Sequence, residues 1–279
     1  MRASALGVIA IAVIVALGGC AGPDPGLSPE PSPPATSPAA QEVVADVYFS
    51  HAQPTEFTLI DEPQTVLVPD GASVLDTVLG AVVSGELQPI DPDYANLWGN
   101  GSVLLSTSRA GDVLTVDLTV GSLNVGAEAE SIAIAQLVWT AVGLDPAIGA
   151  VQLTIDGAVA ETLAGHVDIS GPISPEPPES VLTPVQIVAP AEGASVMSPV
   201  VASGVACVFE ASFLWQLEGP GGSLVEGSGM AAEACPARAD WQLDLGDLAA
   251  GDYVLTVLEL SMNDGSVSST DSKAFTVTG

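Results

Sequence analysis

The residue types that carry most enzyme chemistry are scarce in this chain of 279 residues. Only two histidines occur, His51 and His166, and neither has a second histidine at the spacing of a metal site. The chain therefore has too few histidines for a zinc centre or a histidine-based triad to be expected. We expect both histidines at the surface or at a strand edge. The motifs GxSxG, HExxH, SxxK, GxGxxG and the P-loop do not occur. We expect no catalytic residue, no metal and no cofactor.

Carboxylates, in contrast, are abundant: 34 Asp and Glu face only 4 Lys and Arg, which gives a net charge of −30. Paired carboxylates for glycoside hydrolysis stay open as an alternative, although so many acids produce close pairs by chance. Asp91 and Asp93 match the start of a calcium loop, but Asn96 and Ser102 replace its glycine and its glutamate, which excludes an EF-hand. We expect Tyr94 and Trp98 to anchor the same loop, with sugar stacking as the alternative. Nucleic acid is excluded as a partner because the few cations are scattered singly.

Cys207 and Cys235 lie 28 residues apart and suit an oxidising compartment. We predict that they form a disulfide, which would contribute about 3 to 4 kcal/mol by restricting the unfolded chain. Two free, buried thiols remain the alternative.

The third cysteine, Cys20, follows Leu17, Gly18 and Gly19 at the end of an apolar run that is too short to span a bilayer. This ending resembles the lipobox of bacterial lipoproteins, which implies a signal peptide over residues 1–19 and lipidation of Cys20. Residues 20–42 then form a tether, because seven prolines fall between Ala21 and Ala40. We expect the mature protein on the outer face of the cell membrane, held by its N-terminal lipid.

Residues 43–169 mix two periodicities and predict an α+β domain with two helices packed on a small sheet. Alternating segments over 44–49, 113–120 and 151–155 predict strands. Apolar residues at helical spacing predict a first helix over 73–84 that ends at Gly85, and a second over 128–142 that ends at Gly143. Glu128 and Glu130 fall where a helix N-terminus favours anions.

Residues 170–184 contain five prolines and predict a hinge between two domains. Residues 185–279 follow with short apolar stretches separated by turn signals, which predict an immunoglobulin-like β-sandwich. Phe209, Phe213 and Leu217 belong to an alternation that predicts one buried face. The segment ending in Tyr253 is similar to the tyrosine corner of such sandwiches.

Two longer segments carry a family resemblance. Residues 131–140 and 151–157, with the strand 114–118 and the helix before it, resemble the GerMN domain of sporulation and spore germination. Residues 187–190, 198–199, 208–215 and 261–266 resemble the immunoglobulin-like domain of bacterial spore-germination proteins. The resemblance implies a cell-envelope lipoprotein, of an actinobacterial cell, that works by assembly. Glu210 matches the second motif and is our candidate interaction residue, with an outward-facing strand carboxylate as the alternative.

The sequence thus predicts a membrane-anchored, non-enzymatic interaction or assembly module of the cell envelope. Its expected partner is an envelope protein or peptidoglycan, and self-assembly is also open. The alternative is a lipoprotein that binds or hydrolyses peptidoglycan, which would need a cleft with two acids of separated pKa.

Overall fold

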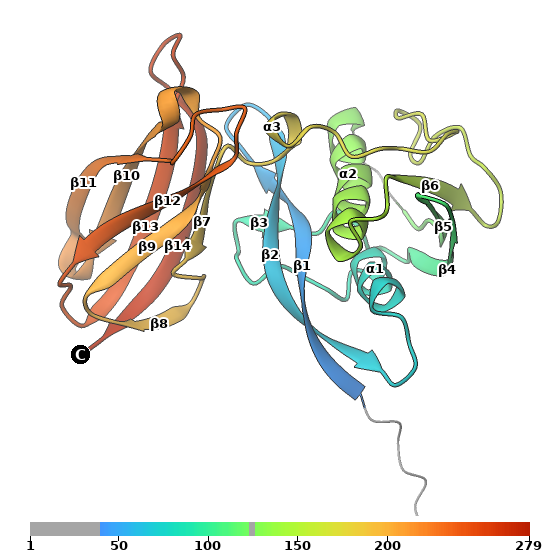
Figure 1. The fold of residues 1–279 in the computed structure, drawn as a ribbon, viewed down its shortest axis with the longest axis horizontal. Helices are drawn as coiled ribbons and strands as arrows, with labels where there is room; N and C mark the ends of the chain where they lie inside the picture. The colour runs from blue at the N-terminus through green and yellow to red at the C-terminus, as the bar shows by residue number, and fades with distance from the viewer. Residues whose placement is uncertain (1–39, 123–125) are drawn as a thin grey trace, which may run out of the picture. The chain divides into compact units, whose positions relative to one another are not determined.

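The computed structural model describes residues 40–122 and 126–279 (Figure 1). The predictions for the signal peptide, for lipidation of Cys20 and for most of the tether lie outside these residues. All described residues fall within one compact unit. No helix in the two described ranges is long and apolar enough to cross a membrane.

Residues 40–169 are here called the α+β part, and its described residues, 40–122 and 126–169, form two helices and six strands. The helices are α1 (Val74–Ser84) and α2 (Ala127–Leu144). The strands are β1 (Ala40–Ala52), β2 (Phe57–Pro69), β3 (Tyr94–Ala95), β4 (Val103–Ala110), β5 (Val113–Thr119) and β6 (Ala150–Ile155). They form two sheets, in the orders β2-β1-β3 and β4-β5-β6.

Helix α1 begins and ends as the sequence predicts. The hydroxyl of Ser73 accepts a hydrogen bond from the backbone N–H of Asp76 at 3.3 Å, which caps the first turn. Gly85 takes the left-handed conformation (φ 74°) that ends the helix at low steric cost. Helix α2 runs slightly beyond its predicted limits, and Asp145 rather than Gly143 follows its last turn.

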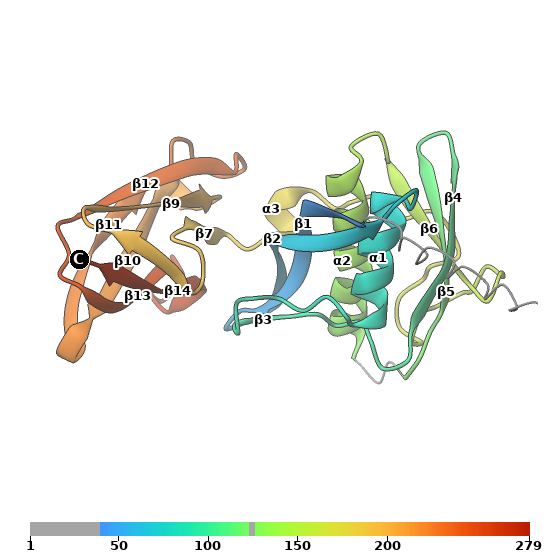
Figure 2. The same ribbon diagram turned by 90° about the horizontal axis from the view of Figure 1, so that it is seen from below.

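The two helices lie between the two sheets (Figure 2). Their apolar residues share one core with β1, β2, β5 and β6, in which Phe49, Leu79, Leu118, Leu137 and Leu153 are fully buried. The α+β class is therefore confirmed, but the predicted single sheet is in fact two. An alternating pattern shows that a segment is a strand, but it does not show which strand it pairs with. The sequence therefore did not reveal that the long β1–β2 hairpin belongs to a different sheet from β5 and β6.

Residues 185–279, here called the sandwich, form two packed sheets. The five-stranded sheet has the order β11-β10-β13-β14-β8, and the three-stranded sheet has the order β12-β9-β7. Their strands are β7 (Val185–Ala189), β8 (Ala194–Met197), β9 (Val200–Ala206), β10 (Ser212–Gly219), β11 (Ser223–Met230), β12 (Ala239–Gly246), β13 (Gly251–Leu260) and β14 (Val267–Thr278). Two short 3-10 turns also occur, η1 (Phe209–Ala211) and η2 (Pro220–Gly222).

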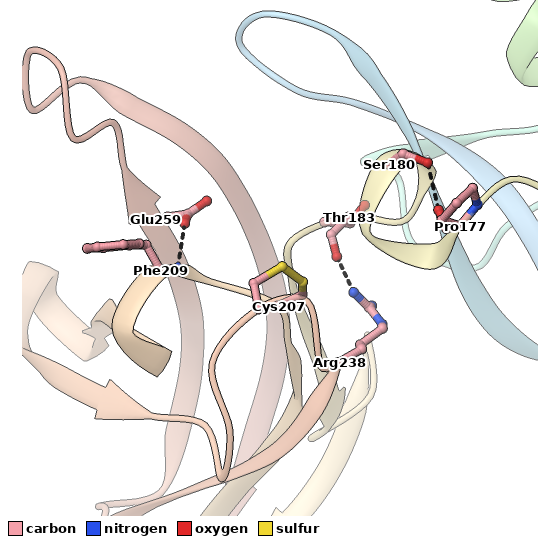
Figure 3. The surroundings of a disulfide bond; sticks show 8 residues. Pro177, Ser180, Thr183, Cys207, Phe209, Arg238 and Glu259 are labelled. Carbon is pink, nitrogen blue, oxygen red and sulfur yellow. Dashed lines mark hydrogen bonds between the residues drawn. A yellow bond between two sulfur atoms is a disulfide. The ribbon is translucent and has the colours of Figure 1, made fainter.

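Two predicted details of the sandwich are confirmed and one is wrong. The Tyr253 hydroxyl donates to the carbonyl of Ala249 at 3.0 Å, as a tyrosine corner does. Cys207 and Cys235 form the predicted disulfide (Figure 3). The predicted alternation does not extend back to Phe209, because Phe209 belongs to η1 and is 56% exposed.

The proline-rich segment 170–184 makes regular contacts with the α+β part. Ile173 and Val151 exchange backbone hydrogen bonds of 2.8 Å. The short helix α3 (Pro178–Val181) follows, and the backbone N–H of Thr183 donates to the carbonyl of Leu59 at 2.8 Å. Val181 and Leu182 are buried. Both ends of the segment are therefore fastened to strands of the α+β part before the sandwich begins.

Candidate functional site

Ionisable side chains from the two parts of the chain meet in one buried cluster, which we call the charged junction. Its members are Asp91 and Tyr94 of the α+β part, and Asp271 and Lys273 of β14. Asp271 and Lys273 lie on the same side of β14 as Phe275 and Val277, which belong to the sandwich core. The two charged residues therefore continue the inward face of the strand to the point where the α+β part covers it.

The charged junction is densely hydrogen-bonded. The Lys273 ammonium group donates to a carboxylate oxygen of Asp91 and to the Tyr94 hydroxyl, and it lies 3.7 Å from Asp271. The Tyr94 hydroxyl donates to Asp271 at 2.8 Å. The second oxygen of Asp271 accepts from the backbone N–H of Ile187 at 2.6 Å. Each carboxylate thus has a cation and a hydrogen-bond donor, which is what burial of a charge requires.

Glu62 positions the loop that brings Asp91 and Tyr94 to the junction. Its carboxylate accepts from the backbone N–H groups of Ile90 (2.7 Å) and Asp91 (3.0 Å), and from the side-chain amide of Gln64 (2.6 Å). Glu62 is only 8% exposed. A buried carboxylate of β2 therefore fixes the backbone on which the junction residues sit.

The opposite face of β14 is also bound by the α+β part. Gln53 exchanges two hydrogen bonds with the backbone of Thr270, accepting at 2.9 Å and donating at 3.1 Å. The Ser272 hydroxyl donates to Asp93 at 2.7 Å. Residues 270–273 consequently contact the α+β part through the side chains of Asp271, Ser272 and Lys273 and through the backbone of Thr270.

His51 lies beside the junction and contradicts the expectation of a surface or edge histidine, since it is only 3% exposed. Its Nδ1 atom is 2.9 Å from the Gln53 side-chain nitrogen, and its ring packs edge-on against Tyr94 with centroids 5.0 Å apart. Burial, opposed by the nearby Asp93 carboxylate, lowers the pKa of His51 to about 4. The ring is therefore neutral at pH 7. His166 is exposed, as expected.

Burial also governs the acids of the junction. It raises the pKa of Asp271 to about 6, against the opposing effects of Lys273 and of the two hydrogen-bond donors. Burial and the neighbouring Asp271 carboxylate raise the pKa of the Tyr94 hydroxyl far above its ordinary value, so this group stays protonated and acts as a donor.

Arg238 forms a second contact beside the junction. Its guanidinium donates to the carbonyl of Thr183 (Figure 3) and, at 2.6 Å, to the side-chain oxygen of Gln186. The amide nitrogen of Gln186 in turn donates to the carbonyl of Asp61 on β2 at 2.9 Å. A cation of the sandwich is thus used to bind the backbone of the connecting segment.

A cavity of about 300 Å³ opens beside the junction. Its lining includes the carboxylates of Asp46, Asp61, Glu62 and Glu192, together with Lys273 and Tyr94. Three of these side chains already have partners. Lys273 binds Asp91 in the charged junction, Glu62 accepts from the backbone N–H of Asp91, and Glu192 accepts from the backbone N–H of Ala274 at 2.7 Å. Among residues 40–122 and 126–279, no group of three or more His, Cys, Asp or Glu side chains is placed to hold a metal ion. The charged junction is therefore a structural joint, because its charged groups bind one another.

Of the residues singled out from the sequence, Asp91 and Tyr94 belong to the charged junction, and His51 and Asp93 lie beside it, whereas Glu210 does not. Tyr94 and Trp98 anchor their loop as predicted, and the Trp98 indole donates to the carbonyl of Ala133 at 2.8 Å. Glu210 is exposed in η1, just before β10 begins and outside any strand, with φ 54°, so the alternative of a strand carboxylate is wrong. Sequence reasoning missed Asp271 and Lys273, although their shared parity with Phe275 was a usable signal that both are buried.

Comparison with known proteins identifies both parts. A family described as "Sporulation and spore germination" matches residues 46–161, and one described as "Immunoglobulin-like domain of bacterial spore germination" matches residues 184–266. No curated protein matches the chain.

Three solved structures are among those that resemble the chain. The first GerMN domain of the sporulation protein GerM from Bacillus subtilis is 20% identical over 47% of this chain and 97% of its own, with a TM-score of 0.37. The tandem GerMN domains of the same protein are 11% identical over 53% of this chain and 50% of theirs, with a TM-score of 0.37. A "Putative Lipoprotein" from Clostridium perfringens is 21% identical over 48% of this chain and 87% of its own, with a TM-score of 0.33. From the two family matches, the chain carries a domain of the sporulation and spore germination family followed by an immunoglobulin-like domain of bacterial spore germination.

Proposed function

We propose that this protein is a lipid-anchored interaction module on the outer face of the cell membrane, without enzymatic activity of its own. The observation that carries the proposal is the order of its parts: a lipobox-like ending at Cys20, a proline-rich tether, and two domains that both belong to sporulation and germination families. We further propose domain limits of 43–169 and 185–279, joined by residues 170–184.

The charged junction supports this proposal in a second way. Lys273 is 5% exposed and is bound by two carboxylates and a hydroxyl, and Glu62 is bound by two backbone N–H groups and an amide. Groups held in this way are poor general acids or bases, because accepting or releasing a proton would leave a buried partner unpaired. A joint that is bound in this way between the α+β part and the sandwich suits a protein that presents a binding surface on each.

The anchor is tested by expressing the full chain beside Cys20→Ser in a bacterium that processes lipoproteins. We expect the parent in the membrane fraction with an N-terminal lipidated cysteine detected by mass spectrometry, and the variant released or unprocessed. Cys207→Ser is the matched control and keeps membrane association, because Cys207 lies in the sandwich. Equal fractionation of the parent and Cys20→Ser would reject the anchor.

The partner class is tested by chemical crosslinking of the anchored full chain in intact envelopes, beside co-sedimentation with purified peptidoglycan. We expect reproducible crosslinks to one envelope protein and no sedimentation with the wall. Sedimentation with peptidoglycan in the absence of any protein crosslink would reject the proposal in favour of a wall-binding lipoprotein. Release of soluble wall fragments by the purified chain would reject the non-enzymatic assignment.

A further inference from the structure

One end of the five-stranded sheet carries apolar side chains on its outer face, which we call the outer patch. Its members are exposed to the following degrees: Phe209 56%, Leu214 40%, Met230 68%, Leu260 37%, Met262 75% and Val267 39%. Scattered exposed apolar residues are ordinary, but a contiguous group on one face marks an interaction surface.

The strand register shows that the outer patch is continuous. Leu214 of β10 pairs with Ser228 of β11 on one side and with Leu258 of β13 on the other. Leu260 pairs in turn with Val267 of β14, and Met230 pairs with the residue two before Leu214. Phe209, Leu214, Leu260 and Met262 also line one groove of about 220 Å³. The groove thus spans η1, β10 and β13, and exposed apolar side chains extend from it to β14 and to β11, where Met230 also lines a hollow shared with β9 and β12.

The backbone of η1 holds Phe209 outward. Glu210 and Ala211 have φ values of 54° and 59°, two successive non-glycine residues in the left-handed region. Such residues are strained and persist only where surrounding contacts fix them. Here the contacts are backbone hydrogen bonds from Ala231 to Ala211 (2.8 Å) and from Cys235 to Val208 (3.2 Å), next to the disulfide. The exposure of Phe209 is thus built into the turn.

The charges around the outer patch are all negative. Glu210 and Glu259 line its groove, and Glu259 accepts from the backbone N–H of Phe209 at 3.3 Å (Figure 3). Within the described part of the chain, the cations are engaged elsewhere: Arg109 with Asp145, Arg238 with the connecting segment and Lys273 in the charged junction.

The negative charge around the outer patch favours some binding partners over others. A second copy of the chain would bring another net charge of −30 against the two carboxylates, and anionic lipid would be repelled in the same way. A protein segment with a lysine or arginine beside its apolar side chains complements both the groove and its rim. Exposed methionines also suit such binding, because their side chains adapt to an incoming surface.

We propose that the outer patch binds a segment of an envelope protein that inserts large apolar side chains into the groove and places a lysine or arginine beside Glu210. This inference deepens the proposed function and rests on it, because it assigns the surface through which the protein partner is recognised. Glu210 acts as the residue that selects basic over acidic segments.

The first test uses a photo-crosslinking amino acid in the full chain in envelopes, at position 209 or 262, with position 201 as the control. Val201 is 45% exposed and belongs to β9 of the other sheet. We expect products only from 209 and 262, mapping to an apolar partner segment with Lys or Arg within about one helical turn or two strand residues. Products with lipid, with the wall, with a second copy or with an acidic segment would overturn the inference, as would no product at all.

The charge requirement is tested by Glu210→Lys, with Glu226→Lys on β11 as the matched control. We expect at least a tenfold loss of crosslinking from position 209 in the first variant and little change in the second. Equal yields from the two variants would overturn the role of Glu210. If envelope crosslinking still recovers a protein partner while positions 209 and 262 give nothing, the outer patch is wrong and the proposed function stands.

A second test needs no identified partner. Methyl-labelled methionine places one probe at Met230 and one at Met262 in the outer patch, with Met197 on β8 as an internal control. We titrate the full chain in nanodiscs with two synthetic peptides that share their apolar residues and carry either lysine or glutamate beside them. We expect the lysine peptide alone to shift Met230 and Met262, and Glu210→Lys to abolish the shift. Equal effects of both peptides, or equal shifts of all three methyl groups, would overturn the inference.

Discussion

At the scale of single residues, Lys273 is the group on which the charged junction depends. Asp91 and Asp271 are each 1% exposed, and this one ammonium group serves both of them. A pair of buried carboxylates with one cation keeps an excess negative charge, which the Tyr94 hydroxyl and the Ile187 N–H partly compensate by donating hydrogen bonds. Removing the cation has a larger effect than removing a surface ion pair.

We predict that Lys273→Met lowers the free energy of unfolding of the chain from Gln41 onward by about 3–5 kcal/mol at pH 7, because two carboxylates are left buried without a cation. Urea unfolding measures the change. Arg109→Met is the control: its partner Asp145 is exposed, with side-chain exposures of 35% and 41% for the pair, so we expect a loss of about 0–1 kcal/mol. Equal losses in the two variants would contradict the role given to Lys273.

The pKa shifts of Asp271 and His51 predict opposite pH dependences. Asp271 has a folded-state pKa raised from 3.8 to about 6, so between these values the folded chain binds more protons and stability falls as pH rises. His51 has a folded-state pKa lowered from 6.5 to about 4, so the unfolded chain binds more protons and stability rises with pH in nearly the same window. In the parent the two effects oppose each other.

Relative to the parent, we therefore expect Asp271→Asn to make stability rise more steeply between pH 4 and 6.5, and His51→Gln to make it fall. Unfolding free energies of the three proteins at half-unit steps of pH measure the differences. Asp168→Asn is a control, because Asp168 is exposed and its pKa is lowered rather than raised. Parallel curves for the parent and both junction variants would disprove the assignment.

At the scale of elements, Glu130 does more than complement the N-terminus of α2. It is fully buried, and its carboxylate accepts from the backbone N–H groups of Ala164 (2.8 Å), His166 (3.0 Å) and Val167 (3.2 Å). A charge at the start of a helix thus holds a loop that would otherwise lack backbone partners.

We predict that Glu130→Gln loses about 1–3 kcal/mol of stability, since the amide nitrogen cannot accept from an N–H group that the carboxylate satisfied. Hydrogen exchange should accelerate first at Ala164, His166 and Val167. Glu128→Gln provides the matched control, because Glu128 is exposed and accepts one bond, from Phe57 at 2.9 Å. Unchanged exchange at those three amides would refute the contact.

The disulfide between Cys207 and Cys235 should contribute to the sandwich alone. Replacing both cysteines with alanine is expected to lower its stability by about 3 to 4 kcal/mol, because the unfolded chain regains the freedom of a loop that spans 28 residues. Differential scanning calorimetry, with reduced parent as a second sample, measures the loss. A double variant as stable as the oxidised parent would show that the bridge has no such effect.

At the scale of the whole molecule, the net charge of −30 predicts self-repulsion that salt relieves. Raising NaCl from 0.01 to 0.1 M shortens the Debye length from about 30 Å to about 10 Å, and Tm should rise. A Tm that does not change over this range would contradict the predicted self-repulsion.

Much of the fold could be predicted because local signals agreed with the final packing. Ser73 and Gly85 mark the limits of α1 in the sequence, and Tyr253 carries its corner within a few residues. The charged junction could not be predicted in the same way, because it joins Asp91 to Lys273 across 182 positions. In the sequence, a charged residue that is buried on an alternating strand looks the same as one that faces solvent. The two can be distinguished only when the element that packs on the strand is known.

The prediction that Phe209 lies on a buried strand face was wrong for a different reason. Its position in an alternating run favours a buried strand residue, whereas two left-handed residues after it turn the chain before β10 begins. Such a turn depends on tertiary contacts near the disulfide, and no turn-forming residue marks it in the sequence.

The late position of β14 in the chain has a consequence for biosynthesis. Asp91 is synthesised long before Lys273, so its carboxylate lacks this cation until β14 has been made. A polypeptide that lacks β14 would leave Asp91 and Tyr94 without the side chains of Asp271 and Lys273 that bind them. The loop that carries Asp91 and Tyr94 should therefore be more accessible to a protease in such a polypeptide than in the full chain.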